Sequence, residues 1–184
     1  MEYRPSRGFP VEYAALGFLV EAPRHGYDLH RDLSEGLGAL WHIALSQLYS
    51  VLHRLVEEKW AAVEVEPQED RPSRQMYSVT AEGRRAFWQW ACSPVTHPRD
   101  LRVIFLAKVY FLRRLRPEAV RGLIDAQRRQ LCDIAAALRE RGSASSDDAA
   151  VAAATCSFRA GQMENAIRWL DASRKLLESA KEET

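Results

Sequence analysis

The sequence predicts a mainly α-helical chain with one small β-hairpin, on three observations. Apolar residues recur at helical spacing over most of the 184 residues, which is the pattern of amphipathic helices. One stretch, Ala62 to Glu66, instead alternates apolar and polar residues as a half-buried strand does. Glycines and prolines separate these stretches. The length suits one compact module with an extension.

Three helices are predicted before the first strand. The first spans Val11 to Val20, and the second spans Gly26 to Glu35 and is terminated by Gly36 and Gly38. The third begins at Ser46, whose hydroxyl is a suitable N-cap because it can accept a hydrogen bond from a free backbone N–H.

The third helix has two unlike faces. Its apolar residues recur at i, i+3, i+4 and i+7, so they form one stripe that consists of Leu48, Val51, Leu52 and Leu55. The opposite face is polar, aromatic and basic and carries Ser46, Gln47, Tyr49, Ser50, His53 and Arg54. No acidic residue occurs from Gly36 to Val56. A buried stripe backed by such a face is typical of a helix that contacts a partner.

A hairpin and a fourth helix complete the first half. A polar connector joins the first strand to a second one over Gln75 to Val79. Thr80 is then expected to cap a helix that carries Phe87, Trp88 and Trp90. Helix, helix, helix, hairpin, helix is the element order of a winged helix-turn-helix, which we expect over residues 1–92.

The second half, residues 93–184, is predicted to be helical. Asp100 to Leu115 is rich in apolar residues, and within 117–141 a heptad-like seam consists of Val120, Ile124, Leu131, Ile134 and Leu138, skipping the polar Gln127. A last helix over 148–180 carries Phe158, Met163, Ile167, Leu170 and Leu177. Two long antiparallel helices with apolar seams predict a dimerisation region.

The charge of the chain gives no overall basic character. The net charge is +1; residues 1–90 hold 10 Lys+Arg against 13 Asp+Glu, a net of −3, and the remainder holds 16 against 12. A basic footprint for nucleic acid must therefore be local. No apolar stretch has the length of a transmembrane helix or the character of a signal peptide, so we expect a cytoplasmic protein.

Several chemical functions are disfavoured. The three cysteines, Cys92, Cys132 and Cys156, are odd in number and far apart, which favours buried reduced thiols, with a redox-sensing cysteine as the alternative. The histidines show no ligand spacing, so neither a metal nor a cofactor is expected; they are His25, His30, His42, His53 and His97. Without a phosphate-binding glycine loop or a nucleophile motif, an enzyme is disfavoured.

Short motifs follow one another in a fixed order between residues 11 and 112. They are Leu16-Gly17-Phe18-Leu19, Pro23-Arg24-His25-Gly26-Tyr27-Asp28-Leu29, Gln47-Leu48-Tyr49 with Leu52-x-Arg54-Leu55, Arg71-Pro72-Ser73-Arg74, Tyr77-Ser78-Val79-Thr80, Glu82-Gly83 and Phe105-Leu106-Ala107-Lys108. As an ordered set they resemble the PadR family of bacterial transcriptional regulators. Beyond residue 112 the resemblance rests on length and helicity, and is to the longer members with a two-helix C-terminal region.

The resemblance implies a homodimer that binds a near-palindromic operator in double-stranded DNA, usually as a repressor, and that a small aromatic effector releases. In a helix-turn-helix the recognition helix enters the major groove. There Gln47 is expected to read an adenine and Arg54 to meet guanine or phosphate, while Tyr49 and Ser50 reach phosphates. The alternative for this face is a solvated helix surface.

Other residues extend the expected DNA contact. Arg71 and Arg74 would grip the DNA backbone or minor groove, the alternative being a charged hairpin tip that keeps the protein soluble. Tyr27 would touch a phosphate or pack half-buried. The sequence departs from the family where Lys59 and Asp70 stand at positions at which glycine is common. Asp70 and its neighbour Glu69 weaken the case for tight wing contacts.

Two interpretations stay open beside these. Phe87, Trp88 and Trp169 could line an effector pocket, although packing in the core or an interface is the favoured role. A winged-helix module that binds a protein instead of DNA is the competing function, motivated by the net −3 of the first half and by the acidic hairpin tip.

Overall fold

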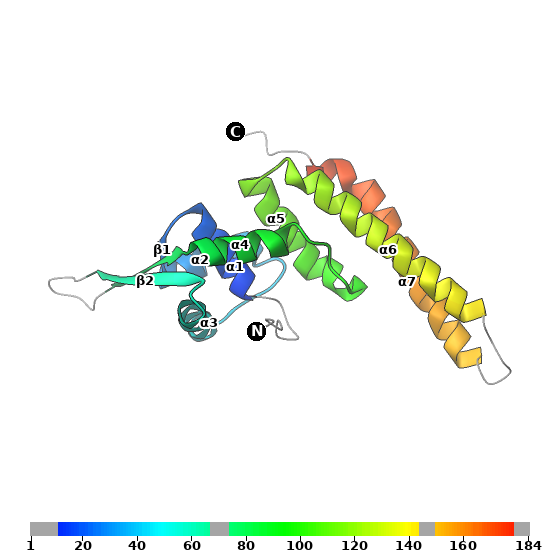
Figure 1. Ribbon diagram of the computed structural model, residues 1–184, viewed down its shortest axis with the longest axis horizontal. Helices are drawn as coiled ribbons and strands as arrows, with labels where there is room; N and C mark the ends of the chain where they lie inside the picture. Colours follow the sequence, from blue (N-terminus) through cyan, green and yellow to red (C-terminus); the bar gives the residue numbers. More distant parts are fainter. Residues whose placement is uncertain (1–10, 67–73, 144–149, 179–184) are drawn as a thin grey trace. The chain divides into compact units, whose positions relative to one another are not determined.

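The protein is described by a computed structural model that covers residues 11–66, 74–143 and 150–178. It divides into two compact units. The first comprises Met1–Ala91 and Arg102–Phe111, and the second comprises Cys92–Leu101 and Leu112–Thr184. Most of the described residues are helical and the strands form one small sheet (Figure 1), which confirms the predicted fold class.

Three helices build the core of the first unit. They are α1 (Val11–Glu21), α2 (Gly26–Leu37) and α3 (Leu45–Glu57), close to the predicted ranges. α1 is central because α2, α3, α4 (Ala81–Ala91) and β3 (Arg74–Val79) all contact it. From Val11 to Leu19 every residue of α1 except Tyr13 is buried. Because the helix is surrounded by other elements, apolar residues occur on all its sides and not along one stripe.

The hairpin belongs to a three-stranded antiparallel sheet with the order β1-β3-β2. β2 (Ala61–Glu66) and β3 (Arg74–Val79) are the two predicted strands. β1 (Arg24–His25) was not predicted and pairs with the other edge of β3, where Arg24 lies opposite Tyr77. Two residues are too few to show an alternating pattern, so no local signal marks this strand.

The turn between α3 and β2 contains Lys59 at a φ of 60°, the one non-glycine residue with positive φ in the described ranges. Its N–H donates to the carbonyl of Val56 at 3.0 Å, and the N–H of Trp60 donates to the carbonyl of Leu55 at 2.8 Å. These bonds form a Schellman motif, whose left-handed position usually holds glycine. The lysine therefore preserves the turn.

Thr80 caps α4 (Ala81–Ala91), as predicted. Its Oγ1 accepts a hydrogen bond from the Gly83 N–H at 3.0 Å and donates one to the Lys59 carbonyl at 2.7 Å. A β-carbon at Gly83 would collide with the carbonyl oxygen of Trp60. The motif Thr80 to Gly83 thus joins the start of α4 to the turn that ends α3.

The helix predicted over 100–115 is present, but it begins irregularly. A 3-10 turn (Pro98–Asp100) leads into a π-helical turn (Leu101–Phe105) and then into α5 (Leu106–Leu115). Pro98 stands in the first turn, where its missing N–H is not needed.

In the first unit, Phe111 packs edge-on against Phe18 and Phe87, with ring centroids 5.2 and 5.6 Å apart.

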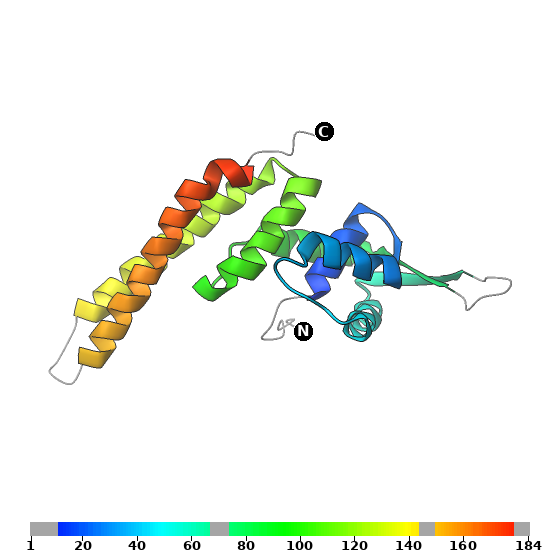
Figure 2. The same ribbon diagram turned by 180° about the vertical axis from the view of Figure 1, so that it is seen from behind.

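In the second unit α6 (Ala119–Ser143) and α7 (Ala150–Glu178) run side by side (Figure 2). The predicted seam is largely confirmed, since the buried apolar residues of the pair include Val120, Ile124, Leu131, Leu138, Met163, Leu170 and Leu177. It packs the two helices of one chain together. The prediction that Phe158 joins this seam was wrong: it is 67% exposed, because it lies about 140° around α7 from Met163.

The polar position in the seam has a defined partner. Gln127 is completely buried, and its side-chain amide forms two hydrogen bonds with the backbone of Val95. Its Oε1 accepts from the Val95 N–H at 2.7 Å, and its Nε2 donates to the Val95 carbonyl at 3.1 Å.

In the described ranges, no helix combines the length and apolar character needed to cross a membrane.

Candidate nucleic-acid interface

α3 presents the two faces that its sequence predicts. Leu48, Leu52 and Leu55 are completely buried, and Val51 is nearly so. All residues of the opposite face are exposed, and we call them the α3 face: Ser46, Gln47, Tyr49, Ser50, His53 and Arg54. The apolar stripe fixes the helix to the first unit, so the six polar and aromatic side chains are directed to solvent.

The prediction that Ser46 caps α3 was wrong. The helix begins one residue earlier, at Leu45, and its N-cap is Ala44, which has an extended backbone and no side chain that could accept a hydrogen bond. Ser46 therefore lies inside the first turn. Its hydroxyl is not used as a cap, and its carbonyl accepts a hydrogen bond from the Ser50 hydroxyl at 3.1 Å.

Tyr49 lies against the start of α2. A β-carbon at Gly26 would stand 2.7 Å from Cε1 of the Tyr49 ring, so glycine is what allows this close approach. The next residue, Tyr27, is 65% exposed, which excludes the half-buried packing role considered for it. Sequence reasoning missed this use of Gly26, although a glycine at the first position of a helix is a signal of close contact.

Tyr77 of β3 is buried close to Tyr49. Burial, and then the proximity of Tyr49, raises the pKa of Tyr77. Its hydroxyl donates a hydrogen bond to Oε1 of Gln75 at 2.7 Å. The tyrosine is therefore a neutral part of the scaffold under Tyr49 and not a charged group of the surface.

Arg54 is engaged by a residue that sequence reasoning missed. Its Nη2 donates a hydrogen bond to Oε1 of Glu12, which lies in the first turn of α1 with its side chain 3% exposed. The side chain of Arg54 is itself 45% exposed. A carboxylate within the apolar stretch from Val11 to Val20 was the available signal, since a buried charge requires a partner.

The other end of the α3 face carries a mixed charge. Nδ1 of His53 lies 3.4 Å from Oε1 of Glu57, one helical turn further along. Both side chains are well exposed, so this pair is weak. Glu57 therefore ends the part of α3 that is free of acidic side chains.

The hairpin contributes one described arginine. Arg74 is exposed at the first position of β3, opposite Glu66 in the antiparallel register. Arg71, Glu69 and Asp70 lie outside the described residues. The predicted contact of Arg71 and Arg74 with DNA stays a prediction.

The three candidate pocket residues differ in their surroundings. Phe87 is completely buried in the first unit, where it packs against Trp88 at 5.0 Å between ring centroids. Trp169 belongs to the second unit and is 37% exposed. Packing accounts for Phe87, as the favoured alternative supposed, and the effector pocket stays a prediction.

An aromatic cluster near α1 was not singled out by sequence reasoning. The ring of Tyr13 stacks on Trp90 with centroids 5.1 Å apart and lies 5.9 Å from Trp60. Burial, and then the charge of Glu58, raises the pKa of Tyr13. Lys108 is almost fully buried, with its Nζ 5.2 Å from the centroid of Trp90, a cation–π geometry.

The remaining chemical groups form no further centre. Within the described ranges no three His, Cys, Asp or Glu side chains lie together as metal ligands would. Cys92 is exposed and Cys132 and Cys156 are partly exposed, so the expectation of buried thiols was wrong.

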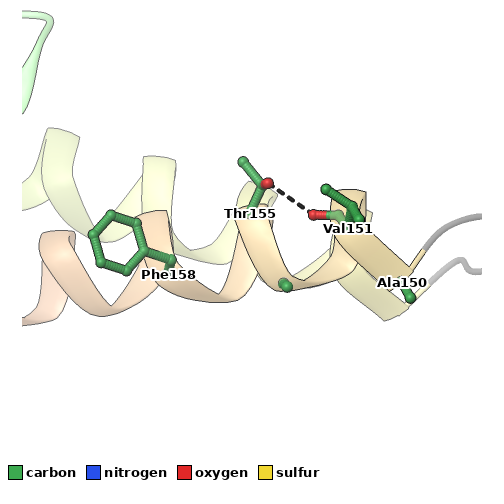
Figure 3. Close-up of a pocket in the computed structure, with 5 residues that line it drawn as sticks. Ala150, Val151, Thr155 and Phe158 are labelled. Carbon is green, nitrogen blue, oxygen red and sulfur yellow. Dashed lines mark hydrogen bonds between the residues drawn. The ribbon is translucent and has the colours of Figure 1, made fainter.

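An exposed apolar stripe runs along α7. Val151, Phe158, Trp169 and Leu176 are 80, 67, 37 and 70% exposed. Their spacings of 7, 11 and 7 residues place all four within about 20° around the helix, and we call them the α7 stripe. At its start Val151 and Phe158, with Ala150, Ala154 and Thr155, line a shallow open hollow (Figure 3). Such a stripe on a helix already packed on its other side indicates a second interface.

In a comparison with known proteins, two family models match the chain, one in each half. The transcriptional regulator PadR-like family matches residues 15–89, and the family described as virulence activator alpha C-term matches residues 101–178. Both matched segments fall largely within described helices and strands.

Individual relatives agree with the first match. The Negative transcriptional regulator PadR of Bacillus subtilis is 28% identical over 117 residues, 64% of each chain. A Mycobacterium tuberculosis protein named Probable transcriptional regulator Rv1176c is 26% identical over 50% of this chain and 49% of its own length. The matches thus span less than two thirds of these relatives, and neither relative is named as an enzyme.

Among solved structures, Bacillus subtilis PadR in complex with operator DNA is similar at a TM-score of 0.48 and 22% identity, over 95% of this chain and 99% of that chain. The motifs between residues 11 and 112 and the matched segment 15–89 point to the same family. The segment 15–89 therefore belongs to the transcriptional regulator PadR-like family.

Proposed function

We propose that the protein is a repressor that binds operator DNA through the α3 face. The observation that carries this proposal is a helix that a buried leucine stripe fixes to the first unit. Before its last residue, Glu57, it exposes no acidic side chain, and none occurs in the whole stretch from Gly36 to Val56. The name of the Bacillus subtilis relative, a negative transcriptional regulator, supports repression as the outcome.

The residues have distinct roles in this proposal. Gln47 lies near the start of α3, the part of a recognition helix that meets base edges, and it is the candidate for reading an adenine. Ser46, Ser50 and His53 reach bases or phosphates from the outer side of the helix. Tyr49 donates a hydrogen bond to phosphate from its position on Gly26.

Tyr27 and the hairpin arginines would flank the helix. Tyr27 is exposed at the N-terminus of α2, where His25 forms no side-chain cap and backbone N–H groups favour an anion. Arg74 and Arg71 would add non-specific contacts to the DNA backbone or minor groove.

The homodimer is part of the same proposal, with the α7 stripe as its interface. The predicted seam is occupied by α6 of the same chain, so a second copy needs another apolar surface. The stripe from Val151 to Leu176 spans 26 residues of helix, about 38 Å, and a second copy of α7 would offer the same surface. Two α3 helices would then read a near-palindromic site. Such a regulator would work in the cytoplasm.

Release by a small aromatic effector completes the proposal. Its support is the family resemblance together with the number of aromatic side chains in the first unit. p-Coumaric acid, with which Bacillus subtilis PadR has been solved, is the first probe. Quenching of tryptophan fluorescence that is lost in Trp88→Phe would place the effector near α4, and unchanged fluorescence together with unchanged DNA binding would remove this ligand.

The test of DNA binding begins with the DNA upstream of the gene and a selection from random duplexes. The wild type is expected to bind a selected operator with an affinity that falls steeply with salt, because counterions are released. Gln47→Ala should lower operator affinity about ten-fold and leave the salt slope unchanged. Gln130→Ala, at a partly exposed position of α6, is the matched control.

Arg74→Ala should instead weaken binding to all sequences and reduce the salt slope by about one per subunit. If the wild type selects no sequence and binds no duplex in a salt-dependent way, the proposal fails. A stoichiometric partner protein that binds the α3 face would then establish the competing function, the protein-interaction module.

A further inference from the structure

Glu12 is a carboxylate in apolar surroundings. Its side chain is 3% exposed, and helical spacing places it on the same side of α1 as the buried Leu16 and Leu19. Its Oε1 accepts the hydrogen bond from Arg54, and its Oε2 is buried and accepts none from any described residue. An ionised carboxylate in this position depends on Arg54 for its counter-charge.

The pair is uneven, because Arg54 is 45% exposed. A guanidinium carries five N–H donors in a rigid planar fork. The bond from Nη2 to Glu12 is the one hydrogen bond that the fork makes to the described part of the chain. Part of the fork is therefore held while the rest lies at the edge of the α3 face.

Arg24 shows what a fully engaged arginine looks like in the same unit. It is 18% exposed, its Nε and Nη2 donate to Asp32 and Glu21, and its Nη1 donates to the carbonyl of Phe18. All arms of that fork are used to join α1 to α2. Arg54 differs because its position is fixed by one partner and its remaining donors are available.

We propose that Glu12 is a positioning residue of the DNA-binding surface. It fixes the orientation of the Arg54 guanidinium and cancels its charge, so that Arg54 meets DNA as an oriented hydrogen-bond donor and not as a mobile cation. This inference rests on the proposed function. It assigns to a buried residue of α1, which cannot touch DNA, a part in the selectivity of α3.

A consequence follows for salt dependence. A neutralised arginine releases few counterions, so Arg54 contributes to sequence discrimination more than to non-specific affinity. Removing the Glu12 charge leaves the charge of Arg54 uncompensated, so that Arg54 attracts any phosphate. Binding to random DNA should then become tighter, and selectivity for the operator should fall.

The test compares Glu12→Gln with the wild type on a selected operator and on a scrambled duplex, at several salt concentrations. Glutamine preserves the shape of the side chain and an oxygen that accepts from Arg54, but it removes the charge. Glu21→Gln is the matched control, since it removes a carboxylate that pairs with an arginine at the other end of α1. Circular dichroism and thermal unfolding verify that each variant folds.

Glu12→Gln is expected to lower the operator-to-scrambled affinity ratio about ten-fold and to steepen the salt slope by about one per subunit. In an Arg54→Ala background the same substitution should have no effect, and Glu21→Gln should behave as the wild type. An unchanged ratio and slope in Glu12→Gln, or an effect that persists without Arg54, overturns the inference.

Arg54→Lys keeps the test valid if Glu12→Gln does not fold. Lysine is still paired with Glu12 but lacks the planar fork. The affinity ratio should fall while the salt slope stays constant, and full selectivity of Arg54→Lys would overturn the inference. Failure of the proposed function is recognised separately, because the wild type itself would then show no salt-dependent DNA binding. The inference about Glu12 would fail together with the proposed function.

Discussion

The ring of Tyr49 lies directly on the backbone of Gly26, with Cε1 2.7 Å from the position that a β-carbon would occupy. This contact joins the start of α2 to the exposed face of α3. In Gly26→Ala the methyl group displaces the ring, since the ring is the end of a side chain that can move. We expect operator affinity to fall about ten-fold, equivalent to about 1.4 kcal/mol, while the fold is retained.

Gly122→Ala is the control for the Tyr49 prediction. A β-carbon at Gly122 meets nothing within 4 Å, so this substitution should leave DNA binding unchanged and stabilise α6 by about 0.5–1 kcal/mol. DNA binding measured by fluorescence anisotropy and thermal unfolding separate the two effects. Operator affinity equal to that of the wild type in Gly26→Ala would show that Tyr49 does not contact DNA.

Lys59 holds a left-handed conformation that costs a lysine side chain about 1–2 kcal/mol relative to glycine. Lys59→Gly should therefore raise the free energy of unfolding, by about 1 kcal/mol after the greater flexibility of the unfolded glycine chain is included. Urea denaturation followed by circular dichroism measures this change.

The neighbouring residue provides the control for Lys59. Glu58 has a right-handed backbone at φ −79° and ψ 0°, so Glu58→Gly should destabilise by about 0.5–1 kcal/mol. Two glycine substitutions one residue apart are thus expected to have opposite signs. Equal destabilisation by both would mean that the positive φ is not the source of strain.

The sequence predicted those features whose cause is local. The apolar stripe from Leu48 to Leu55 predicted α3, and the hydroxyl of Thr80 predicted the start of α4. Both features depend on residues that lie within a few positions of one another. The N-cap of α3 was predicted wrongly for a related reason. A side chain that can cap a helix does not by itself determine at which residue the helix begins, and the N-cap position is occupied by Ala44.

The missed features depend on distant partners. β1 exists because β3, about 50 residues later, offers its free edge. The Glu12–Arg54 pair joins residues 42 positions apart, so no window of sequence contains both. α7 carries two apolar stripes, and periodicity alone does not say which one faces α6; this is why Phe158 was assigned to the wrong side.

Gln127 is predicted to stabilise the second unit through its two bonds with the backbone of Val95. Gln127→Leu keeps the approximate volume but leaves a buried N–H and a carbonyl without partners. Each such group costs about 1–3 kcal/mol, so we expect a loss of about 2–4 kcal/mol in the free energy of unfolding. Gln130→Leu, on a partly exposed position of α6, should change it by less than about 0.5 kcal/mol. Urea denaturation that gave similar values for both variants would exclude the proposed role of this amide.

Phe158 is the most sensitive point at which to test the α7 stripe as a dimer interface. In Phe158→Asp a charge would be buried between two copies of α7 without a partner, which is strongly unfavourable, while the monomer keeps an exposed position exposed. We expect the variant to sediment as a folded monomer in analytical ultracentrifugation at concentrations at which the wild type is a dimer. Its operator affinity should fall because two recognition helices are no longer linked. Ser157→Asp places the same charge on an exposed neighbouring position about 100° around the helix and should remain dimeric. A dimeric Phe158→Asp would move the interface to another surface, and a monomeric wild type would remove the homodimer from the proposal altogether.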